Sequence, residues 1–289
     1  MTIGEQIGQV IISGLTMGSI YAIIGIGLAV TYNVTRIFNF CQGEFVMIGG
    51  MLSASFYSLG LSLPLSIGLA IGITAIIGAA IWLLFLNRPF ARHSSLVTLI
   101  LITVALSIVV SGGVYIGWGT PFRELPSFAN ISPIRLGEMI IDPQVPWIWG
   151  GLLALVVGLT FLFDHTLLGK GLRACSEQPI GARLTGINPR SMAFFSFILA
   201  SLTGSIAGVL VIPLTMTSFG VGLGYSIKGL LAAMVGGITK IHGVIVGGMI
   251  LGLVESLAGG FISSTYMDAA GLAVLIILLL YRPEGILRN

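Results

Sequence analysis

The residues best placed to do chemistry are polar side chains set in stretches that are otherwise almost wholly apolar. One is Glu255, within "MILGLVESLAGG". An ionised carboxylate facing lipid is costly. We therefore expect Glu255 to face the protein interior, paired or near water, as a candidate translocation-pathway or gate residue. The alternative is an interhelical hydrogen bond with no role in transport.

A second polar group lies in "NFCQGEF", where a glycine-containing break separates two apolar segments. Its candidate pathway or gate residues are Asn39, Gln42, Gly43 and Glu44. Non-helical backbone at membrane depth persists only where it is buried in protein or lines a water-filled cavity. The segment therefore predicts a pathway element, and the alternative is a polar turn at the cytoplasmic surface.

A third candidate is the polar stretch "SEQPIGARLTGINP", residues 176–189. Ser176 is a suitable N-cap, Glu177 suits the positive end of a helix dipole, and Pro179 is tolerated in a first turn. Gly186 is a typical C-terminal stop. The pattern predicts a helix of about nine residues at 177–185, which is too short to be stable alone in water.

Such a helix needs a surface to pack on. Ile180, Leu184 and Ile187 recur at roughly helical spacing, and Ala182 and Arg183 lie between them. Two interpretations remain open. The apolar stripe packs on the protein's own cytoplasmic face, or the helix docks on a cytoplasmic partner.

The sequence gives little support for an enzyme, and we predict no catalytic and no metal-binding residues. No Gly-x-x-x-x-Gly-Lys-Ser/Thr loop is present to hold ATP phosphates. His93, His165 and His242 are isolated from one another and from paired carboxylates. Cys41 and Cys175 fall in different expected environments, so no disulfide is expected.

The elements that must position these residues follow from composition, since 56% of the 289 residues are hydrophobic and 8% are charged. A bilayer core about 30 Å thick needs about 20 apolar residues per helical crossing. The sequence predicts an all-α, polytopic helical membrane protein with about eight or nine transmembrane or half-membrane helices. The candidate segments are 7–31, 45–59, 65–86, 96–116, 147–163, 192–213, 226–239, 244–262 and 269–281. A β-barrel is excluded because the runs are apolar on every face.

Orientation is predicted from the basic residues, which are retained near span ends on the cytoplasmic side. If the chain crosses at each segment, one side receives Arg36, Arg88, Arg92, Lys170, Arg173, Arg183, Arg190, Lys240, Arg282 and Arg288, and the other side receives Arg123, Arg135 and Lys228. We therefore expect the N-terminus outside and the C-terminus inside. Residues 117–146 are then an extracytoplasmic loop, and residues 165–191 a cytoplasmic one.

Several blocks in this order resemble one protein family. "GLTMGSIYAIIGIGLAVTYNVTRIFNFCQGEFVMIGG", "GKGLRACSEQPIGARLTGINP", "GGITKIHGVIVGGMILGLVES" and "LLLYRPEGIL" are similar to the permease subunits of branched-chain amino acid ABC importers, with urea and amide importer permeases as relatives. The resemblance covers residues 1–289, as a single permease domain. Where the family commonly has Ala-His, this chain has Cys41 and Gln42, which argues against a titratable role at position 42.

The resemblance implies a subunit that forms the translocation pathway for a substrate, with branched-chain or other amino acids as the first choice. ATP hydrolysis would occur in partners, so the chain itself would be no enzyme and would hold no cofactor. The implied residues for coupling to the ATP-binding subunit are Arg173, Ser176, Glu177, Ala182, Arg183 and Gly186.

The implied partners are a second homologous permease subunit, two cytoplasmic ATP-binding subunits that bind ATP and Mg²⁺, an extracytoplasmic substrate-binding protein and membrane lipid. Nucleic acid is not among them. The expected location is a bacterial or archaeal cytoplasmic (inner) membrane. The alternatives are a self-sufficient channel or secondary transporter for a small polar solute and, with least support, an intramembrane enzyme.

Overall fold

The computed structural model describes residues 3–92, 94–129, 132–137, 139–282 and 285–286. His93 and Arg288 of the sequence argument lie outside this set. All nine expected apolar segments form helices, which confirms the predicted fold class.

Within the described residues, six helices are long and apolar enough to cross a membrane. They are α1 (Ile3–Thr35), the continuous run α3 (Leu63–Ile81), η1 (Trp82–Leu86) and α4 (Asn87–Ala91), then α5 (Leu96–Trp118), α6 (Val145–His165), α9 (Pro189–Thr215) and α11 (Ile241–Phe261). The remaining expected segments form the shorter helices α2 (Gln42–Ser58), α10 (Gly222–Gly236) and α12 (Met267–Tyr281), the last preceded by the short turn η2 (Ser264–Tyr266). The polar loop adds α7 (Leu167–Glu177) and α8 (Pro179–Leu184).

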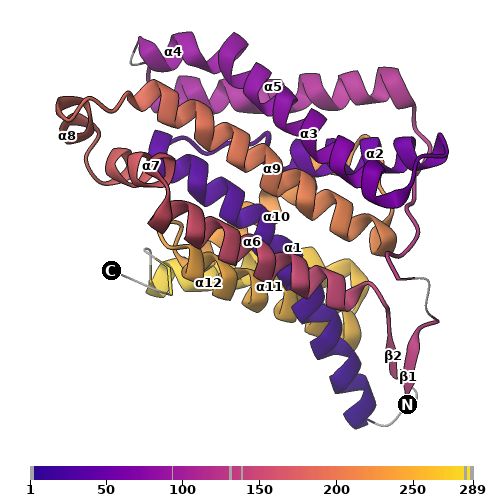
Figure 1. Cartoon of the computed structure of the whole chain (residues 1–289). Helices are drawn as coiled ribbons and strands as arrows, with labels where there is room; N and C mark the ends of the chain where they lie inside the picture. The colour runs from indigo at the N-terminus through magenta and orange to yellow at the C-terminus, as the bar shows by residue number, and fades with distance from the viewer. Residues whose placement is uncertain (1–2, 93, 130–131, 138, 283–284, 287–289) are drawn as a thin grey trace.

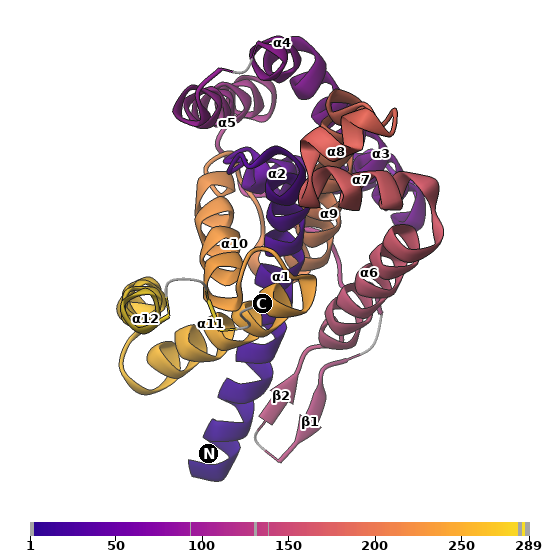
Figure 2. The same ribbon diagram turned by 90° about the vertical axis from the view of Figure 1, so that its left-hand side faces the viewer.

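Helix α1 runs through the middle of the bundle and packs against α9, α10 and α11 (Figure 2). Its central residues Ile20, Ile23 and Ile24 have no exposed surface, so this helix lies at the centre of the hydrophobic core. The α1–α11 contact is close because glycines face each other there: a Cβ built on Gly18 would lie 2.8 Å from the carbonyl oxygen of Gly248. Small residues allow this approach where apolar attraction between membrane helices is weak.

The bundle has two distinct ends (Figure 1). Helices α4, α7 and α8 lie at one, named here the α8 end. The start of α1 and the β1–β2 hairpin lie at the other, named here the hairpin end. The hairpin pairs β1 (Ile134–Leu136) with β2 (Met139–Ile141) in antiparallel register and belongs to the 117–146 interval. Helix α12 finishes at the α8 end, opposite the start of α1.

Two helices are followed by an abrupt break. Helix α1 ends at Thr35, and the chain passes through a non-helical segment, 36–41, before α2. Helix α9 ends at Thr215, and a second such segment, 216–221, precedes α10. Each break begins with a left-handed residue, Arg36 (φ 59°) or Met216 (φ 58°), and among the described residues no other non-glycine residue has a positive φ. Of the polar residues singled out in the sequence, Asn39 lies in the first break, and Gln42 and Glu44 lie in the first turn of α2.

Candidate functional site

The break between α1 and α2 is built from local side-chain hydrogen bonds. The Thr35 hydroxyl oxygen accepts from the Ile37 N–H at 3.2 Å, and the Asn39 Oδ1 accepts from the Cys41 N–H at 3.1 Å. Short polar side chains that hydrogen-bond the backbone two residues on stabilise turns in place of helix. The chain therefore leaves the helix at Arg36 and re-enters it at Gln42.

Gln42 anchors the start of α2 to α9. Its Nε2 donates to the Ala200 carbonyl oxygen at 3.0 Å and to the Thr203 hydroxyl oxygen at 3.4 Å. Asn39 and Gln42 have no exposed surface, and Glu44 is 2% exposed. The alternative of a polar turn at the surface is therefore wrong for these three side chains, because all of them are buried.

Glu44 lies in the first turn of α2, where its Oε1 accepts a hydrogen bond from the Ser107 hydroxyl of α5 at 2.7 Å. Its carboxylate also touches the first turn of α10, because a Cβ on Gly222 would overlap it. The positive ends of two helix dipoles thus flank one carboxylate. Within the described part of the chain, Glu44 Oε2 is buried without a hydrogen-bond donor.

Ser226 of α10 locks the two short helices together. Its hydroxyl donates to the Phe40 carbonyl oxygen at 2.6 Å and accepts from the Gly43 N–H at 2.8 Å. Gly43 is required here because a Cβ would overlap the α10 backbone at Gly222. The breaks, the starts of α2 and α10 and Glu44 therefore form one packed junction, named here the half-helix junction.

Glu255 is buried and paired, as predicted. Its Oε2 accepts from the Lys228 Nζ at 2.8 Å and from the Tyr21 hydroxyl at 2.7 Å. Lys228 also reaches Asp268 at 2.9 Å, at the start of α12. The charge count assigned Lys228 to the outer side of the membrane; instead it lies within α10 and shares a site with Glu255.

Sequence reasoning missed Lys228 and Tyr21 as members of this site, although a cation within an apolar helix is itself a functional signal. The structure does not bring Glu255 to Glu44. Ser226 faces α2, and Lys228, two residues later, points about 200° around α10 at 3.6 residues per turn.

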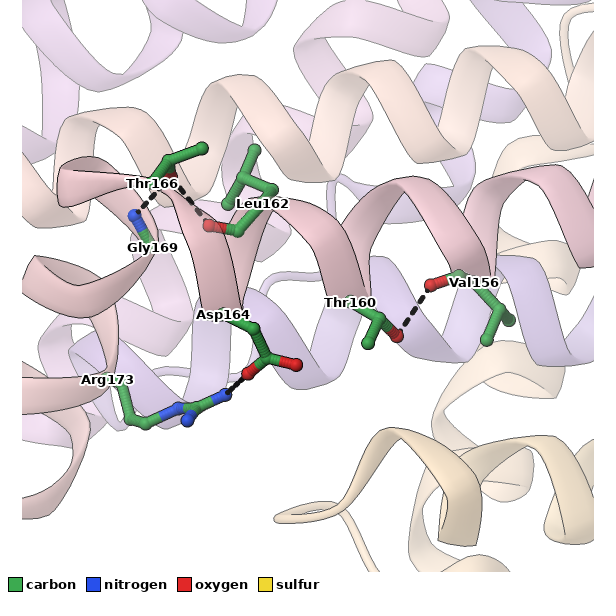
Figure 3. Close-up of polar contacts among 7 residues, drawn as sticks. All are labelled: Val156, Thr160, Leu162, Asp164, Thr166, Gly169 and Arg173. Atoms are coloured by element: carbon green, nitrogen blue, oxygen red, sulfur yellow. Dashed lines mark hydrogen bonds and ion pairs between the residues drawn. The ribbon is translucent and has the colours of Figure 1, made fainter.

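The polar loop folds differently from the single helix predicted at 177–185. Ser176 and Glu177 belong to α7, so Ser176 is not the N-cap of the next helix. Gln178 is extended (φ −142°, ψ 92°), and α8 follows from Pro179. The cause is Pro179, which disfavours helical backbone in the residue before it. The overlooked start signal for α7 is Thr166, whose hydroxyl oxygen accepts from the Gly169 N–H at 3.0 Å (Figure 3).

Helix α8 buries one small side chain and exposes two large ones. Ala182 is buried in a cluster with Leu172 and Cys175 of α7. Ile180 is 76% exposed and Leu184 is 85% exposed. Of the three residues in the predicted apolar stripe, only Ile187 packs on this chain. The interpretation in which the stripe packs on the protein's own cytoplasmic face is therefore wrong.

The Arg183 side chain and the residue that ends α8 are also exposed to solvent. Arg183 is exposed, and Gly186 (φ +85°) ends the helix by donating to the Arg183 carbonyl oxygen at 3.0 Å. In a neighbouring contact Arg173 of α7 pairs with Asp164 of α6 at 2.7 Å (Figure 3). Both side chains of this pair are largely exposed, so it contributes little to stability.

A cavity of about 570 Å³ lies beside this pair at the α8 end. The ends of α1, α6 and α7 line it together with the turn between α10 and α11, and its polar residues include Arg36, Ser176, Glu177 and Lys240. Arg36 crosses this region, since its Nη2 donates to the Ser176 carbonyl oxygen at 2.9 Å. The loop and the first break are thus in direct contact.

Neither cysteine forms a disulfide, and both are buried. Burial raises the pKa of the Cys175 thiol, and the nearby Arg183 lowers it in part. A buried thiol of raised pKa is a poor nucleophile. Cys175 is therefore a packing residue.

The fold is that of a multi-pass helical membrane protein, and comparison with known proteins agrees. The chain resembles a chain in the structure of PsaBC from Streptococcus pneumoniae in complex with Fab, with a TM-score of 0.51, 13% identity, and 94% of this chain and 91% of that chain covered. At that identity the likeness shows the fold.

Sequence comparison gives the family. The family described as branched-chain amino acid transport system / permease component matches residues 10–281. The high-affinity branched-chain amino acid transport system permease protein LivH of Salmonella typhimurium is 30% identical, covering 96% of this chain and 94% of that protein. The corresponding protein BraD of Pseudomonas aeruginosa is 28% identical over 96% of this chain and 95% of that protein. The chain belongs to this permease family and is a multi-pass protein of the cytoplasmic membrane.

Proposed function

We propose that this chain is the membrane-spanning subunit of an ABC importer and forms the pathway for branched-chain or other amino acids. The observation that carries the proposal is α8, a short helix held on the protein by Ala182 while Ile180 and Leu184 point away from it. Exposed apolar side chains on a rigid element are typical of a docking surface. The names of the LivH and BraD relatives support the substrate class.

The importer needs partners that supply what this chain lacks. ATP-binding subunits would bind ATP and Mg²⁺ and dock on α8 at the exposed Arg183, on the adjacent Gly186 and on the end of α7, while the buried Ala182 holds α8 on this chain. A second, homologous permease subunit and an extracytoplasmic substrate-binding protein would complete it. In this proposal the N-terminus is outside and the C-terminus inside, so the hairpin end is extracytoplasmic and residues 165–191 are cytoplasmic, consistent with the excess of basic residues there.

The docking role of α8 is tested by placing a charge on its exposed face. We expect Leu184→Asp to leave the chain folded, because Leu184 is 85% exposed, and to lower co-purification of the ATP-binding subunit about tenfold, the loss produced by about 1.4 kcal/mol. Leu167→Asp is the matched control, since Leu167 is 88% exposed in the same loop but lies at the start of α7. The measurement is ATPase activity in complexes pulled down from gently solubilised membranes.

Two outcomes would contradict the docking role. In one, Leu184→Asp co-purifies with the ATP-binding subunit as the unmodified chain does. In the other, the chain purifies alone and conducts solute in liposomes, which would favour a self-sufficient channel or secondary transporter.

The half-helix junction is the proposed gate. Asn39, Gln42, Gly43 and Glu44 hold the start of α2 at the interior end of a break, and breaks of this kind line pathways in transporters. Movement of α8 with the closing ATP-binding pair would shift α2 and thereby open or close the pathway beside Glu44. The buried Oε2 of Glu44, which has no donor among the described residues, is the acceptor that such a movement would uncover.

The gate is tested by a pair of substitutions in α10. A Cβ on Gly222 would overlap the Glu44 carboxylate, whereas Gly224 has no such neighbour within 4 Å. We expect Gly222→Ala to lower the uptake rate about tenfold, equivalent to about 1.4 kcal/mol, with normal assembly. Gly224→Ala should retain uptake. Equal uptake by both variants would remove Glu44 from the gate.

A further inference from the structure

Arg36 stands at the start of the first break in a conformation that its residue type disfavours. Its φ is 59°, in the left-handed region, where a side chain with a Cβ is strained. Its N–H donates to the Tyr32 carbonyl oxygen at 2.7 Å, closing the last turn of α1. Such a conformation persists only where the surroundings hold it in place.

The Arg36 side chain provides part of that hold. Its Nη2 donates to the Ser176 carbonyl oxygen at 2.9 Å, in the last turn of α7, where carbonyls lack intrahelical partners. The guanidinium also lies 5.8 Å from the centre of the Tyr32 ring, a favourable cation–π distance. One side chain therefore ties the end of α1 to the end of α7.

Apolar packing continues the same connection. Ile37, which follows Arg36, has no exposed surface, and it shares a cluster with Cys41 and Phe45 of the break and α2. Leu172 and Cys175 of α7 belong to this cluster as well, as does Ala182 of α8. Closely packed interiors transmit displacement instead of absorbing it.

Hydrogen bonds continue this connection from the break to the half-helix junction. The backbone of Phe40 and Gly43, a few residues beyond Arg36, is bonded to Ser226 of α10. Glu44 follows in the next position and touches Gly222. The separation between the docking loop and Glu44 is thus bridged by a single break of six residues, 36–41.

We propose that Arg36 is the positioning residue that transmits movement of α7 and α8 to α2 and the half-helix junction. The inference rests on the proposed importer function and deepens it. When the loop moves with an ATP-binding subunit, the Ser176 carbonyl pulls on the guanidinium, and the strained backbone at Arg36 is the point at which the break turns. Without this contact only the apolar cluster joins the loop to α2, so less of the movement of the loop reaches α2.

The test separates ATP hydrolysis from uptake in the complete importer, reconstituted in liposomes with its partner subunits and binding protein. Arg36→Gly keeps a positive φ without strain and removes the guanidinium. We expect this variant to hydrolyse ATP within about twofold of the unmodified importer while substrate taken up per ATP falls about tenfold, within the usual range for coupling between two sites. Arg36→Lys, which retains a donor on a long side chain, should restore part of the ratio.

Arg88→Ala is the control for charge, since Arg88 is an exposed arginine of α4 at the same end. It should leave uptake per ATP unchanged. If Arg36→Gly assembles poorly, Arg36→Asn replaces it, because Asn tolerates left-handed backbone but cannot reach Ser176.

An unchanged ratio in Arg36→Gly or Arg36→Asn would overturn the proposal, and so would an equal loss in Arg88→Ala. Failure of the importer function itself has a different signature, because the unmodified chain would then show no ATP-dependent uptake.

Discussion

Replacing Lys228 by Met should cost the folded chain about 3–5 kcal/mol, because it leaves the Glu255 carboxylate buried without a cation. The Glu255 side chain is 3% exposed, and its pair with Lys228 spans 2.8 Å. Tyr21 remains as a donor at 2.7 Å, but one hydroxyl does not neutralise a charge. The measurement is the free energy of unfolding in one detergent, followed by tryptophan fluorescence across a denaturant series.

The double variant Lys228→Met/Glu255→Gln tests whether the unpaired charge causes this loss of stability. It removes both charges and keeps an oxygen acceptor for Tyr21, so we expect it to recover most of the lost stability, as buried ion pairs do when both partners become neutral. Asp268→Asn is the matched control, because the Asp268 side chain is 78% exposed and its bond to Lys228 should contribute about 0–1 kcal/mol. A double variant no more stable than Lys228→Met would show that the pair is not what stabilises this site.

The helices were predictable because apolar length is a local property of the chain. A run such as 96–116 must cross or enter the bilayer whatever surrounds it, and α5 (Leu96–Trp118) follows it closely. The close approach of Gly18 and Gly248, by contrast, depends on how α1 and α11 lie together, which no local pattern predicts.

The site was predictable only in part, because its geometry depends on long-range pairing. Glu255 could be assigned to the interior from its cost in lipid. Its partner Tyr21 lies 234 residues away in sequence, and no local pattern predicts that contact. The burial of Asn39, Gln42 and Glu44 could not be predicted for the same reason, since it comes from contacts with α5, α9 and α10.

The second break resembles the first, but it is attached to a loop at the opposite end of the bundle. Met216 begins it with φ 58°, and the next residue, Thr217, pairs with Arg123 through backbone bonds of 2.8 and 2.9 Å. Arg123 belongs to the 117–146 interval at the hairpin end, whereas Arg36 contacts α7 at the α8 end. Each break is thus attached to a loop at its own end, and Glu44 of α2 touches Gly222, the residue that follows the second break. In the proposed importer, such a connection would link the side of the binding protein to the side of the ATP-binding subunits.

That connection depends on a rigid support, which predicts a severe effect at Gly248. A Cβ there would lie 2.7 Å from the Ala22 nitrogen and 2.8 Å from the Gly18 carbonyl oxygen, both atoms of the α1 backbone. A side chain could turn aside, but these backbone atoms can yield only if α1 and α11 separate. We expect Gly248→Leu to cost at least about 3 kcal/mol, the upper part of the range for overpacked cores.

The matched control is Gly158→Leu in α6, a helical glycine with no atom within 4 Å of its Cβ position. The measurement is the fraction of each variant that elutes as a monodisperse species after gentle solubilisation. Gly158→Leu should match the unmodified chain, and Gly248→Leu should be largely lost. Equal recovery would mean that α11 can move away from α1 at little cost. The ion pair between Lys228 and Glu255 would then join mobile helices, and α1 could not serve as the fixed support against which α2 moves.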